Sequence, residues 1–366
     1  MASFHFNNIR IAGIAGAVPK KIVKSEEYVD VFGESTVQKF VEMTGVRERR
    51  VTFEHQTASD LGYAAAEKLL QEKQIDRDTI GVLIFGSHCP DYRKPATAAV
   101  LHKRLDLAQE CACFDLGLGC SAFVYCAQVA SSMLACSDAR RALVIVGETP
   151  SKDVYPEDRS QVMLAGDGGA AVIFEKTEND SRIAGRLCTD GRGYRSIIVP
   201  AGGFRNMDAT HEPMIWEDEN PRTLYNTNMN GMDVFTFTMT KVPRTIKAFL
   251  KETAQEIERF DCLAFHQANL LIHQQLAKKL KVDIAKMPLC IDHFGNTSTP
   301  AIPLLLSDVY GGEEDARELN VLMAGFGIGL SWGVMSATIN TADVLPVVET
   351  DDYFAEGVIN SPADLL

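Results

Sequence analysis

The chain has 366 residues, of which 46% are hydrophobic and 23% are charged, and its formal net charge is −13. This composition is typical of a globular protein with one large or two medium domains. The acidic balance excludes nucleic acid as a general partner, because neutralising phosphates requires an excess of Lys and Arg. No apolar run reaches the roughly 20 residues that span a bilayer, and no signal-peptide pattern is present, so we expect a cytoplasmic protein without membrane contact.

The first half of the chain alternates apolar strand patterns with helical patterns. This alternation predicts an α/β fold built in layers, with largely parallel strand pairing. One helix has a clear start, because Thr57 followed three residues later by Asp60 can satisfy the free N–H groups of a first turn. The expected strands are Ile9–Val18, Ile80–Phe85, Cys111–Asp115, Ala142–Gly147 and Gly168–Phe174, and the expected helices are Ser35–Met43, Thr57–Gln74, Thr97–Leu105 and Ser121–Ala135.

The second half repeats this order of elements. Leu83–Phe85 corresponds to Leu263–Phe265, and Ala112–Asp115 corresponds to Leu289–Asp292. Matching order and spacing predict an internal duplication, with one half over residues 1–178 and the other over 179–366. The expected helices are Asp233–Glu258, Leu270–Leu280 and Ala301–Tyr310, and the expected strands are Cys262–Phe265, Pro288–Asp292, Asn320–Ala324 and Trp332–Ile339.

Two segments exceed this repeat. Gly202–Met232 is longer than a simple connection and is rich in Asn, Gly, Pro and Met. So long a connection is uncommon within a compact domain. Residues 341–366 form an acidic tail, which we expect on the surface or on a partner subunit.

A candidate nucleophile lies where the strand Cys111–Asp115 breaks at two glycines and runs into the helix Ser121–Ala135, with Cys120 at the junction. A helix N-terminus favours the reactive thiolate. The flanking glycines allow another backbone or a thioester to approach the sulfur. The alternative is a small buried cysteine that fills a turn. The nine cysteines lie mostly in apolar runs, which indicates reduced thiols rather than a disulfide framework.

Two further polar residues occupy equivalent strand ends. Cys120 follows Asp115 by five residues, Asn296 follows Asp292 by four, and His266 begins the loop after the strand Cys262–Phe265. Function in parallel α/β sheets gathers at the carboxyl ends of strands, so two halves packed about a pseudo-twofold axis can bring these three residues into one pocket. The alternatives are a structural histidine and an ordinary turn asparagine.

Other histidines and cysteines carry weaker signals. His88 has no supporting motif, and neither has His293, although His293 is close enough to Asn296 to line the site. A metal site is not predicted. The pairs His266 with His273 and Cys111 with Cys113 lack the ligand arrangement of a zinc site.

Four motifs in order resemble those of β-ketoacyl-acyl-carrier-protein synthase III, a thiolase-fold condensing enzyme. Several motifs in the right order are a more specific signal than any one of them. The resemblance covers Ile9–Ile339 and implies a duplicated thiolase-like α/β fold in five layers (αβαβα) and a homodimer. For such a protein we expect Gly202–Met232 to cap the active-site tunnel or the edge of the dimer. The motifs are Gly119-Cys120-Ser-Ala, His266-Gln-Ala-Asn269, Phe294-Gly-Asn296-Thr-Ser298 and Gly325-Phe-Gly-Ile-Gly-Leu-Ser-Trp-Gly333, with further matches at Thr44–Arg50, Thr57–Asp60, Asp158-Arg159 and Gly166–Gly169.

The resemblance also implies roles for the site residues. Cys120 is expected to take an acyl group from acyl-coenzyme A or an acyl-acyl-carrier protein, with help from His266. His266 and Asn296 are then expected to polarise the carbonyl of malonyl-acyl-carrier protein, stabilising the enolate that forms as carbon dioxide leaves. The main-chain N–H groups of Cys120 and Ile328 are expected to form an oxyanion hole. No cofactor is implied.

Some positions depart from the family pattern. Lys39 and Met43 stand where the family often has a Trp and an Arg that grip the coenzyme A nucleotide, so the first donor is left open. Lys94 stands where the family tends to place an apolar residue of the acyl pocket, often across a dimer interface. These departures modestly favour a specialised pathway over housekeeping fatty-acid initiation.

The expected carrier-protein docking surface is basic. Lys278 and Lys279 match the family's docking residues, and a local positive patch is enough to steer an acidic carrier. Leu271 occupies a position where an Arg is common, and a solvated helix end is the alternative interpretation. For the whole chain, the alternatives are an acyltransferase that does not decarboxylate and a non-catalytic subunit of a condensing complex.

Overall fold

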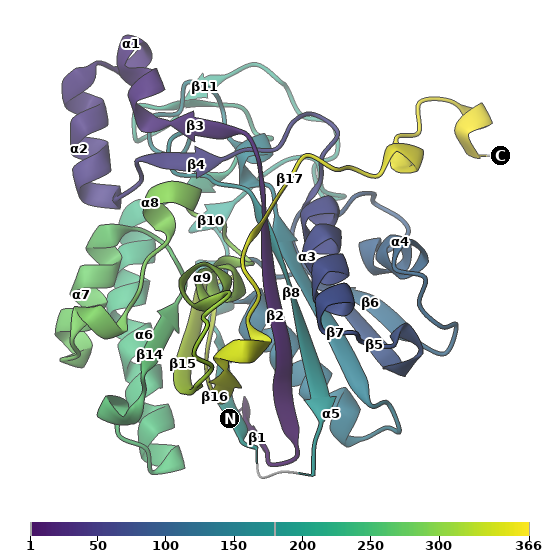
Figure 1. Ribbon diagram of the computed structural model, residues 1–366. Coiled ribbons are helices and arrows are strands. Elements are labelled where there is room, and N and C mark those ends of the chain that lie inside the picture. The colour runs from purple at the N-terminus through teal and green to yellow at the C-terminus, as the bar shows by residue number, and fades with distance from the viewer. Residues whose placement is uncertain (1, 179–180, 366) are drawn as a thin grey trace.

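Two mixed β-sheets form the centre of the molecule, and helices cover and separate them (Figure 1). The computed structural model describes residues 2–178 and 181–365. The boundary predicted between the halves, at 178/179, therefore adjoins residues 179–180, which lie outside the described residues. The first sheet has the order β17-β2-β8-β7-β5-β6 and the second has the order β1-β9-β16-β15-β14.

The elements mostly agree with the sequence patterns, apart from the differences described below. The strands of the sheets are β1 (Ala2–Phe6), β2 (Ile9–Pro19), β5 (Ile80–Gly86), β6 (Ala112–Leu116), β7 (Arg141–Glu148), β8 (Gly168–Lys176), β9 (Ile183–Thr189), β14 (Cys262–Phe265), β15 (Glu318–Gly327), β16 (Ser331–Asn340) and β17 (Val348–Thr350). The helices are α1 (Val29–Phe32), α2 (Glu34–Thr44), α3 (Ala58–Glu72), α4 (Thr97–Arg104), α5 (Ala122–Ala135), α6 (Gly231–Thr253), α7 (Leu270–Leu280), α8 (Ile291–Phe294) and α9 (Ala301–Tyr310). The predicted start of α3 is confirmed, because Thr57 N donates to Asp60 Oδ2 at 2.8 Å.

Three apolar cores hold the two sheets and the helices together as five layers. Helices α3 and α4 pack on the outer face of the first sheet, and α6 and α7 pack on the outer face of the second. Helices α5 and α9 lie between the sheets, in a core that both sheets share. The order αβαβα implied by the family resemblance is confirmed. The N-terminus of α5, which follows Cys120, therefore lies between the two halves.

Largely parallel pairing was expected for the first half, and three of the five described pairs of the first sheet are parallel: β17–β2, β5–β7 and β5–β6. Strand β8 differs, because it runs antiparallel to both β2 and β7. In the second sheet β14–β15 is the one parallel pair among the described strands. Connections explain the difference, since parallel neighbours need a crossover of a dozen or more residues. Strands β15 and β16 are joined by residues 328–330 alone and form a hairpin.

The strand predicted at Pro288–Asp292 is wrong. Residues 288–290 form no strand, and the short helix α8 follows. Side chains bond this main chain in place of a neighbouring strand. Gln267 Oε1 accepts from Cys290 N at 3.1 Å, and His273 Nε2 lies 2.7 Å from Met287 O. The second half thus lacks a counterpart of β6, and the duplication is incomplete.

The C-terminal tail adds a strand that the sequence pattern did not predict. Strand β17 pairs in parallel with β2 at the edge of the first sheet. Gln56 Nε2 donates to Thr350 O at 3.1 Å, and Phe354 N donates to Asp60 Oδ1 at 2.9 Å. The start of the tail is therefore part of its own chain's fold, and its end extends away from the body of the molecule (Figure 1).

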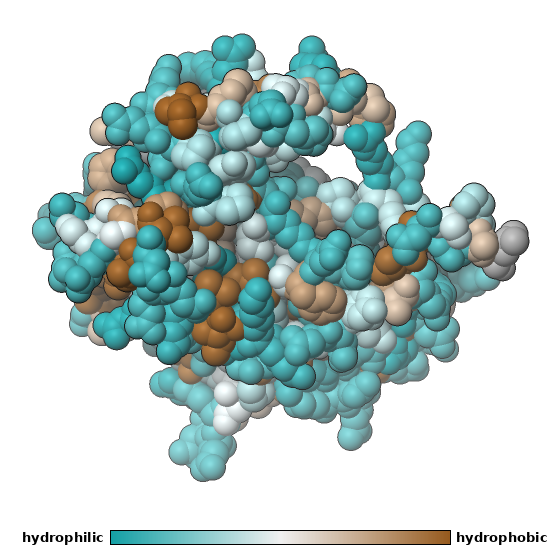
Figure 2. Space-filling model, turned by 90° about the horizontal axis from the view of Figure 1, so that it is seen from above, coloured by the Kyte–Doolittle hydropathy of each residue, from teal (hydrophilic) through white to brown (hydrophobic). Residues whose placement is uncertain are grey.

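The insertion Gly202–Met232 folds into short hairpins beside the sheets. Strand β11 (Met214–Ile215) pairs with β12 (Pro221–Arg222), and β13 (Asn228–Met229) pairs with β10 (Ile197–Ile198). Seen from above, the molecule is mainly hydrophilic, with hydrophobic side chains in a few separate groups (Figure 2). No helix of the described residues is long and apolar enough to cross a membrane.

Candidate active site

Cys120 lies in the tight turn between β6 and α5, where Ala122 N donates to Gly119 O at 2.7 Å. Strand β15 of the other half passes directly over it. A Cβ added at Gly327 would lie 2.8 Å from Cys120 Sγ, and one at Gly325 would lie 2.8 Å from Cys120 O. Only glycine permits this approach of two backbones. The glycine-rich motif of β15 is thus required by the position of the sulfur.

The loop after α8 brings Asn296 and Ser298 to the same place. Ser298 Oγ lies 3.4 Å from Cys120 Sγ, and Ser298 N donates to Asn296 Oδ1 at 2.9 Å. The main chain of Asn296 is fixed by bonds to the first half, since Asn296 N donates to Leu164 O and Gly166 N donates to Asn296 O. A Cβ at Gly166 would lie 1.8 Å from Phe294 O, so the two loops require a glycine there.

His266 follows β14 and is 4% exposed. Its ring meets Phe326 edge to face, with centroids 5.4 Å apart, and its Nδ1 has no hydrogen-bond partner among the described residues. Burial lowers the pKa of His266 to about 4, although a hydrogen bond with the main chain of Ser298 opposes this shift. The ring is therefore neutral at pH 7. His266 is connected to Cys120 through Ser298.

Burial and hydrogen bonding have opposing effects on the pKa of the Cys120 thiol. Burial raises the pKa of Cys120 above its usual value, and nearby Glu148 raises it further. The Ser298 hydroxyl and the main-chain N–H groups of Ile328 and Cys120 favour the thiolate, but burial outweighs them. That the N-terminus of α5 favours the thiolate stays a prediction, because burial raises the pKa of Cys120 by more than these hydrogen bonds lower it. A base has to take the thiol proton before the sulfur can act as a nucleophile, and a neutral imidazole such as that of His266 can accept one.

The turn that carries Ile328 is held against the start of α5. Ser331 Oγ lies 2.7 Å from Ile328 O and 2.6 Å from Ser121 Oγ. Hydrogen bonding from the main-chain N–H groups of Ile328 and Cys120 lowers the pKa of the Cys120 thiol. The turn at Ile328 therefore acts directly on the sulfur, and its role as part of an oxyanion hole stays a prediction.

A cavity of about 580 Å³ opens beside Cys120 and contacts both halves and the insertion. His266 is not among its lining residues and reaches it through Ser298. The expectation that the insertion caps a tunnel is supported, since Thr227 and Met229 form part of the wall. The lining residues are His88, Cys89, Cys120, Glu148, Pro150, Asp153, Gln161, Leu164, Ala165, Tyr194, Ile197, Ile198, Val199, Thr227, Met229, Asn296, Ser298 and Ile328.

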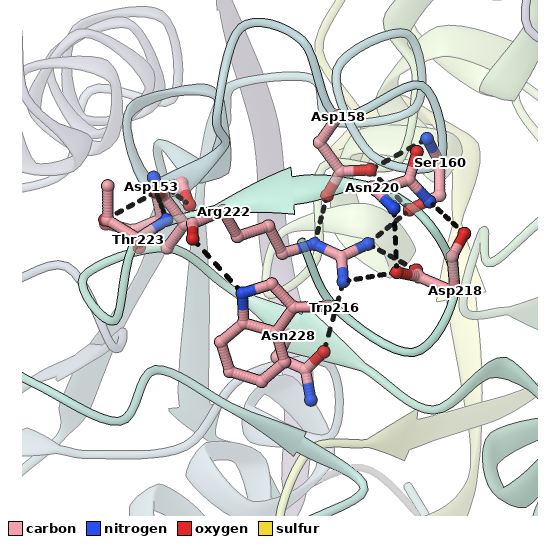
Figure 3. A network of polar contacts seen from close by, with 10 residues as sticks. Asp153, Asp158, Ser160, Trp216, Asp218, Asn220, Arg222, Thr223 and Asn228 are labelled. Atoms are coloured by element: carbon pink, nitrogen blue, oxygen red, sulfur yellow. Dashed lines mark hydrogen bonds and ion pairs between the residues drawn. The ribbon is translucent and has the colours of Figure 1, made fainter. Parts of the chain in front are cut away.

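The insertion is anchored by a buried arginine. Arg222, 1% exposed, donates from Nε to Asp158, from Nη2 to Ser160 Oγ at 3.0 Å and from Nη1 to Asp218 Oδ1 at 3.0 Å (Figure 3). Its main-chain oxygen accepts from Trp216 Nε1 at 3.1 Å. A buried cation with this many partners specifies one position for the hairpin.

Several residues singled out from the sequence lie away from the cavity. Lys94 is exposed and does not line the cavity of its own chain, so its place in an acyl pocket stays a prediction that requires a partner subunit. Lys278 and Lys279 are exposed in the last turn of α7.

His293 does not line the cavity, contrary to expectation. Its ring contacts Asp292 and Asp308 at 2.9 and 3.1 Å, and these carboxylates raise its pKa to about 9.

Sequence reasoning missed the acidic side chains of the cavity and underrated one histidine. Glu148 ends β7, Asp153 ends the short turn that follows, and His88 follows β5. All three lie at or just beyond the carboxyl ends of the parallel pair β5–β7, and a place at a strand end is what predicted His266. The same rule, applied to every strand, would have found them.

The fold and the site together define the class of protein. A duplicated five-layer α/β fold with a half-buried cysteine between its halves is the thiolase fold. The structure of a 3-oxoacyl-(acyl-carrier protein) synthase from Burkholderia xenovorans LB400 superposes with a TM-score of 0.89 and 34% identity, covering 95% of this chain and 99% of that one.

Comparison of sequences identifies the family. The family model of 3-oxoacyl-[acyl-carrier-protein] synthase III matches residues 114–191, and that of its C-terminal part matches residues 250–339. β-Ketoacyl-[acyl-carrier-protein] synthase III of Streptococcus pneumoniae is 32% identical over 334 residues, 90% of this chain and 99% of the relative. The relative from Clostridium acetobutylicum is 30% identical over 329 residues, 90% of this chain and 98% of that one. The chain belongs to the 3-oxoacyl-acyl-carrier-protein synthase III family of condensing enzymes.

Proposed function

We propose that this enzyme transfers an acyl group from a thioester to Cys120 and then joins it to a malonyl thioester by decarboxylative Claisen condensation, giving a 3-oxoacyl product. The observation that carries the proposal is the shared cavity, in which Cys120 and Ile328 meet Asn296 and Ser298 from the opposite half. The relatives are named for this chemistry.

In the first step, Cys120 Sγ attacks the donor carbonyl and His266 takes the thiol proton. The N–H groups of Cys120 and Ile328 stabilise the oxyanion, and the thiolate of the donor leaves with the proton. Because burial keeps the thiol protonated, proton transfer to His266 has to accompany the attack of the sulfur on the donor carbonyl.

In the second step, Asn296 and neutral His266 donate hydrogen bonds to the carbonyl oxygen of the malonyl thioester. The malonyl carboxylate leaves as carbon dioxide, and its bonding electrons form the enolate that attacks the acyl-Cys120 carbonyl. The Cys120 thiolate leaves as the carbon–carbon bond forms. Neutral donors suit this step because they stabilise negative charge without supplying a competing strong acid.

Carrier-protein docking is assigned to Lys278 and Lys279. Both are exposed, and the neighbouring helix α6 adds exposed Arg244, Lys247 and Lys251, spaced so that they share one helix face. An acidic carrier protein is steered by such a local positive surface even though the chain as a whole is negative.

We further propose a homodimer formed through β6. This strand is an edge of the first sheet, and its outer main-chain groups are unpaired among the described strands. Ala112 is exposed, and Phe114 and Leu116 are half-buried, so the edge offers both backbone and apolar contacts. Light scattering should give the mass of two chains, and Lys94 would then lie near the partner's cavity.

Intact-mass analysis tests the chemistry. Incubation with acyl-coenzyme A and acyl-carrier-protein thioesters should give an acyl adduct that Cys120→Ala abolishes. Release of carbon dioxide from malonyl-acyl-carrier protein, lost in Asn296→Ala, separates condensation from simple acyl transfer. Absence of an adduct with every donor would refute the proposal, and an adduct without carbon dioxide release would favour the acyltransferase alternative.

A further inference from the structure

The lining of the active-site cavity combines two kinds of side chain. Leu164, Ile198 and Met229 are among its apolar members, whereas Glu148 and Asp153 bring carboxyl groups. Among the described residues that line it, none is a Lys or an Arg. A pocket for a plain hydrocarbon chain needs no carboxylate, because each one is costly to keep out of water without a partner.

The carboxylate of Glu148 is hydrogen-bonded by groups of the protein itself. Glu148 is 4% exposed, and its Oε1 accepts from His88 N at 2.8 Å. Its Oε2 accepts from the hydroxyl of Thr299, which directly follows Ser298 in the active-site loop. Both oxygens are therefore used to join β7 to the loops that carry the site, and Glu148 is a structural carboxylate.

The carboxylate of Asp153, in contrast, has no such hydrogen-bond partners among the described residues. Asp153 is half-buried and lines the cavity. Burial, with Glu148 and Asp167 nearby, raises the pKa of Asp153 to about 6, and the weaker effect of His88 lowers it. Its carboxylate can therefore accept a hydrogen bond from a molecule in the cavity.

The backbone of Asp153 is held in place by the insertion. Asp153 O accepts from Thr227 N at 2.9 Å and from Asn226 Nδ2 at 3.3 Å. The insertion is in turn anchored through Arg222 (Figure 3). A carboxyl group on a fixed backbone, in the same cavity as a candidate nucleophile, is suited to recognising one part of a substrate.

We propose that the acyl group accepted by Cys120 carries a hydrogen-bond donor, a hydroxyl or an amino group, which Asp153 recognises. This inference rests on the proposed acylation of Cys120 and names the class of acyl group. An acidic lining favours a neutral donor or a cation and disfavours an acyl group that ends in a carboxylate. An unsubstituted chain would leave Asp153 facing hydrocarbon without a partner.

The test compares rates of acyl-Cys120 formation by intact mass. Matched thioesters of one chain length are used, unsubstituted or with a hydroxyl or amino group at successive carbons, on both coenzyme A and carrier protein. The wild type should react with at least one substituted donor about 10-fold or more faster than with the unsubstituted one. Asp153→Leu should remove this preference and react with the unsubstituted donor at least as fast as the wild type does.

Asp153→Asn separates the two sources of the donor group. Its amide oxygen still accepts from a hydroxyl, whereas loss of the negative charge weakens recognition of an ammonium group. Retained preference in Asp153→Asn identifies a hydroxyacyl substrate, and lost preference identifies an aminoacyl one. Glu157→Leu is the matched control, because it removes an exposed acid outside the cavity and should keep the wild-type preference.

Two outcomes overturn the inference while leaving acylation intact. One is a wild type that reacts equally fast or faster with unsubstituted donors. The other is an Asp153→Leu variant, folded by its unfolding temperature, that keeps the preference. Absence of an adduct with every thioester is a distinct result, since it refutes the proposed function itself.

Discussion

Two regions of the cavity are held in place by different kinds of contact. Around Cys120, the contacts are made by a strand-to-helix turn, by glycines of β15 and by a short loop that carries Asn296. Around Asp153, they are made by the insertion and by loops that Arg222 holds. The first region depends on close backbone packing within the fold, and the second on hydrogen bonds and a buried ion pair. The difference suggests that chemistry and substrate choice can be altered separately, and five predictions test this.

Cys120→Ala has the largest expected effect. Loss of the nucleophile should abolish the acyl adduct and reduce product formation by about four orders of magnitude or more. Intact-mass analysis measures the adduct, and an assay of the 3-oxoacyl product measures the rate. Cys89→Ala is the control, because Cys89 lines the same cavity but burial and nearby carboxylates raise its pKa well above the usual value. An adduct that persists in Cys120→Ala would assign the chemistry to another residue.

Arg222→Met tests the second region. It leaves Asp158 buried without its cation, so the free energy of unfolding should fall by about 3–5 kcal/mol. Denaturant unfolding measures this. Arg159→Met is the matched control, since Arg159 and its partner Glu219 are 49% and 86% exposed and their ion pair contributes about 0–1 kcal/mol. Equal effects of the two substitutions would show that the buried pair does not anchor the insertion.

Asn296→Ala tests the first region without removing the nucleophile. Carbon dioxide release from a malonyl thioester should fall about 100- to 1,000-fold, because one donor to the developing enolate is lost. Formation of the acyl adduct should change little. Thr227→Val, on the insertion side of the cavity, should leave carbon dioxide release nearly intact. Equal loss of both steps in Asn296→Ala would place Asn296 in the structure of the loop rather than in condensation.

His266 gives a pH dependence with a definite sign. Its folded pKa of about 4 lies below the ordinary value of 6.5, so between these values the unfolded chain binds the extra proton. Stability is therefore lost as the pH falls from 6.5 towards 4, by an amount on the order of 3 kcal/mol for this residue. His266→Asn should flatten the acid side of the stability profile.

His293→Asn is the matched control for this profile. The carboxylates of Asp292 and Asp308 raise the pKa of His293 to about 9, so its contribution is present below pH 6.5 and is lost as the pH rises through 9. Removing His293 should change the alkaline side. An unchanged acid side in His266→Asn would contradict a buried, neutral His266.

The smallest effect is expected outside the cavity. Lys278→Glu with Lys279→Glu should lower kcat/KM for malonyl-acyl-carrier protein about 10-fold, with weaker salt dependence, and should leave the rate with malonyl-coenzyme A unchanged. Lys20→Glu with Lys21→Glu makes the same charge change at another exposed pair. Equal loss in both variants would show an effect of net charge alone.

Much of the first region could be predicted from local sequence. The glycines on both sides of Cys120 and the end of β14 at His266 are visible along the chain. The layer order was also confirmed. The missed elements are those that depend on distant partners. Strand β17 exists because it pairs with β2. Residues 288–290 form no strand because Gln267 bonds the main chain of Cys290 and His273 contacts that of Met287, directly before this segment.

By itself, the sequence determined the alternation of elements, the duplication and the three residues expected to carry the chemistry. These predictions follow from the periodicity of hydrophobic residues, from turn-forming residues and from polar residues at the ends of strands. All three are local properties of the sequence. Only the tertiary structure decided that burial raises the pKa of Cys120, that His266 is neutral and that Asp153 is an unpaired carboxyl group in the cavity. Burial depends on how distant segments pack against each other, and packing also brings Glu148 and Asp167 close enough to Asp153 to raise its pKa.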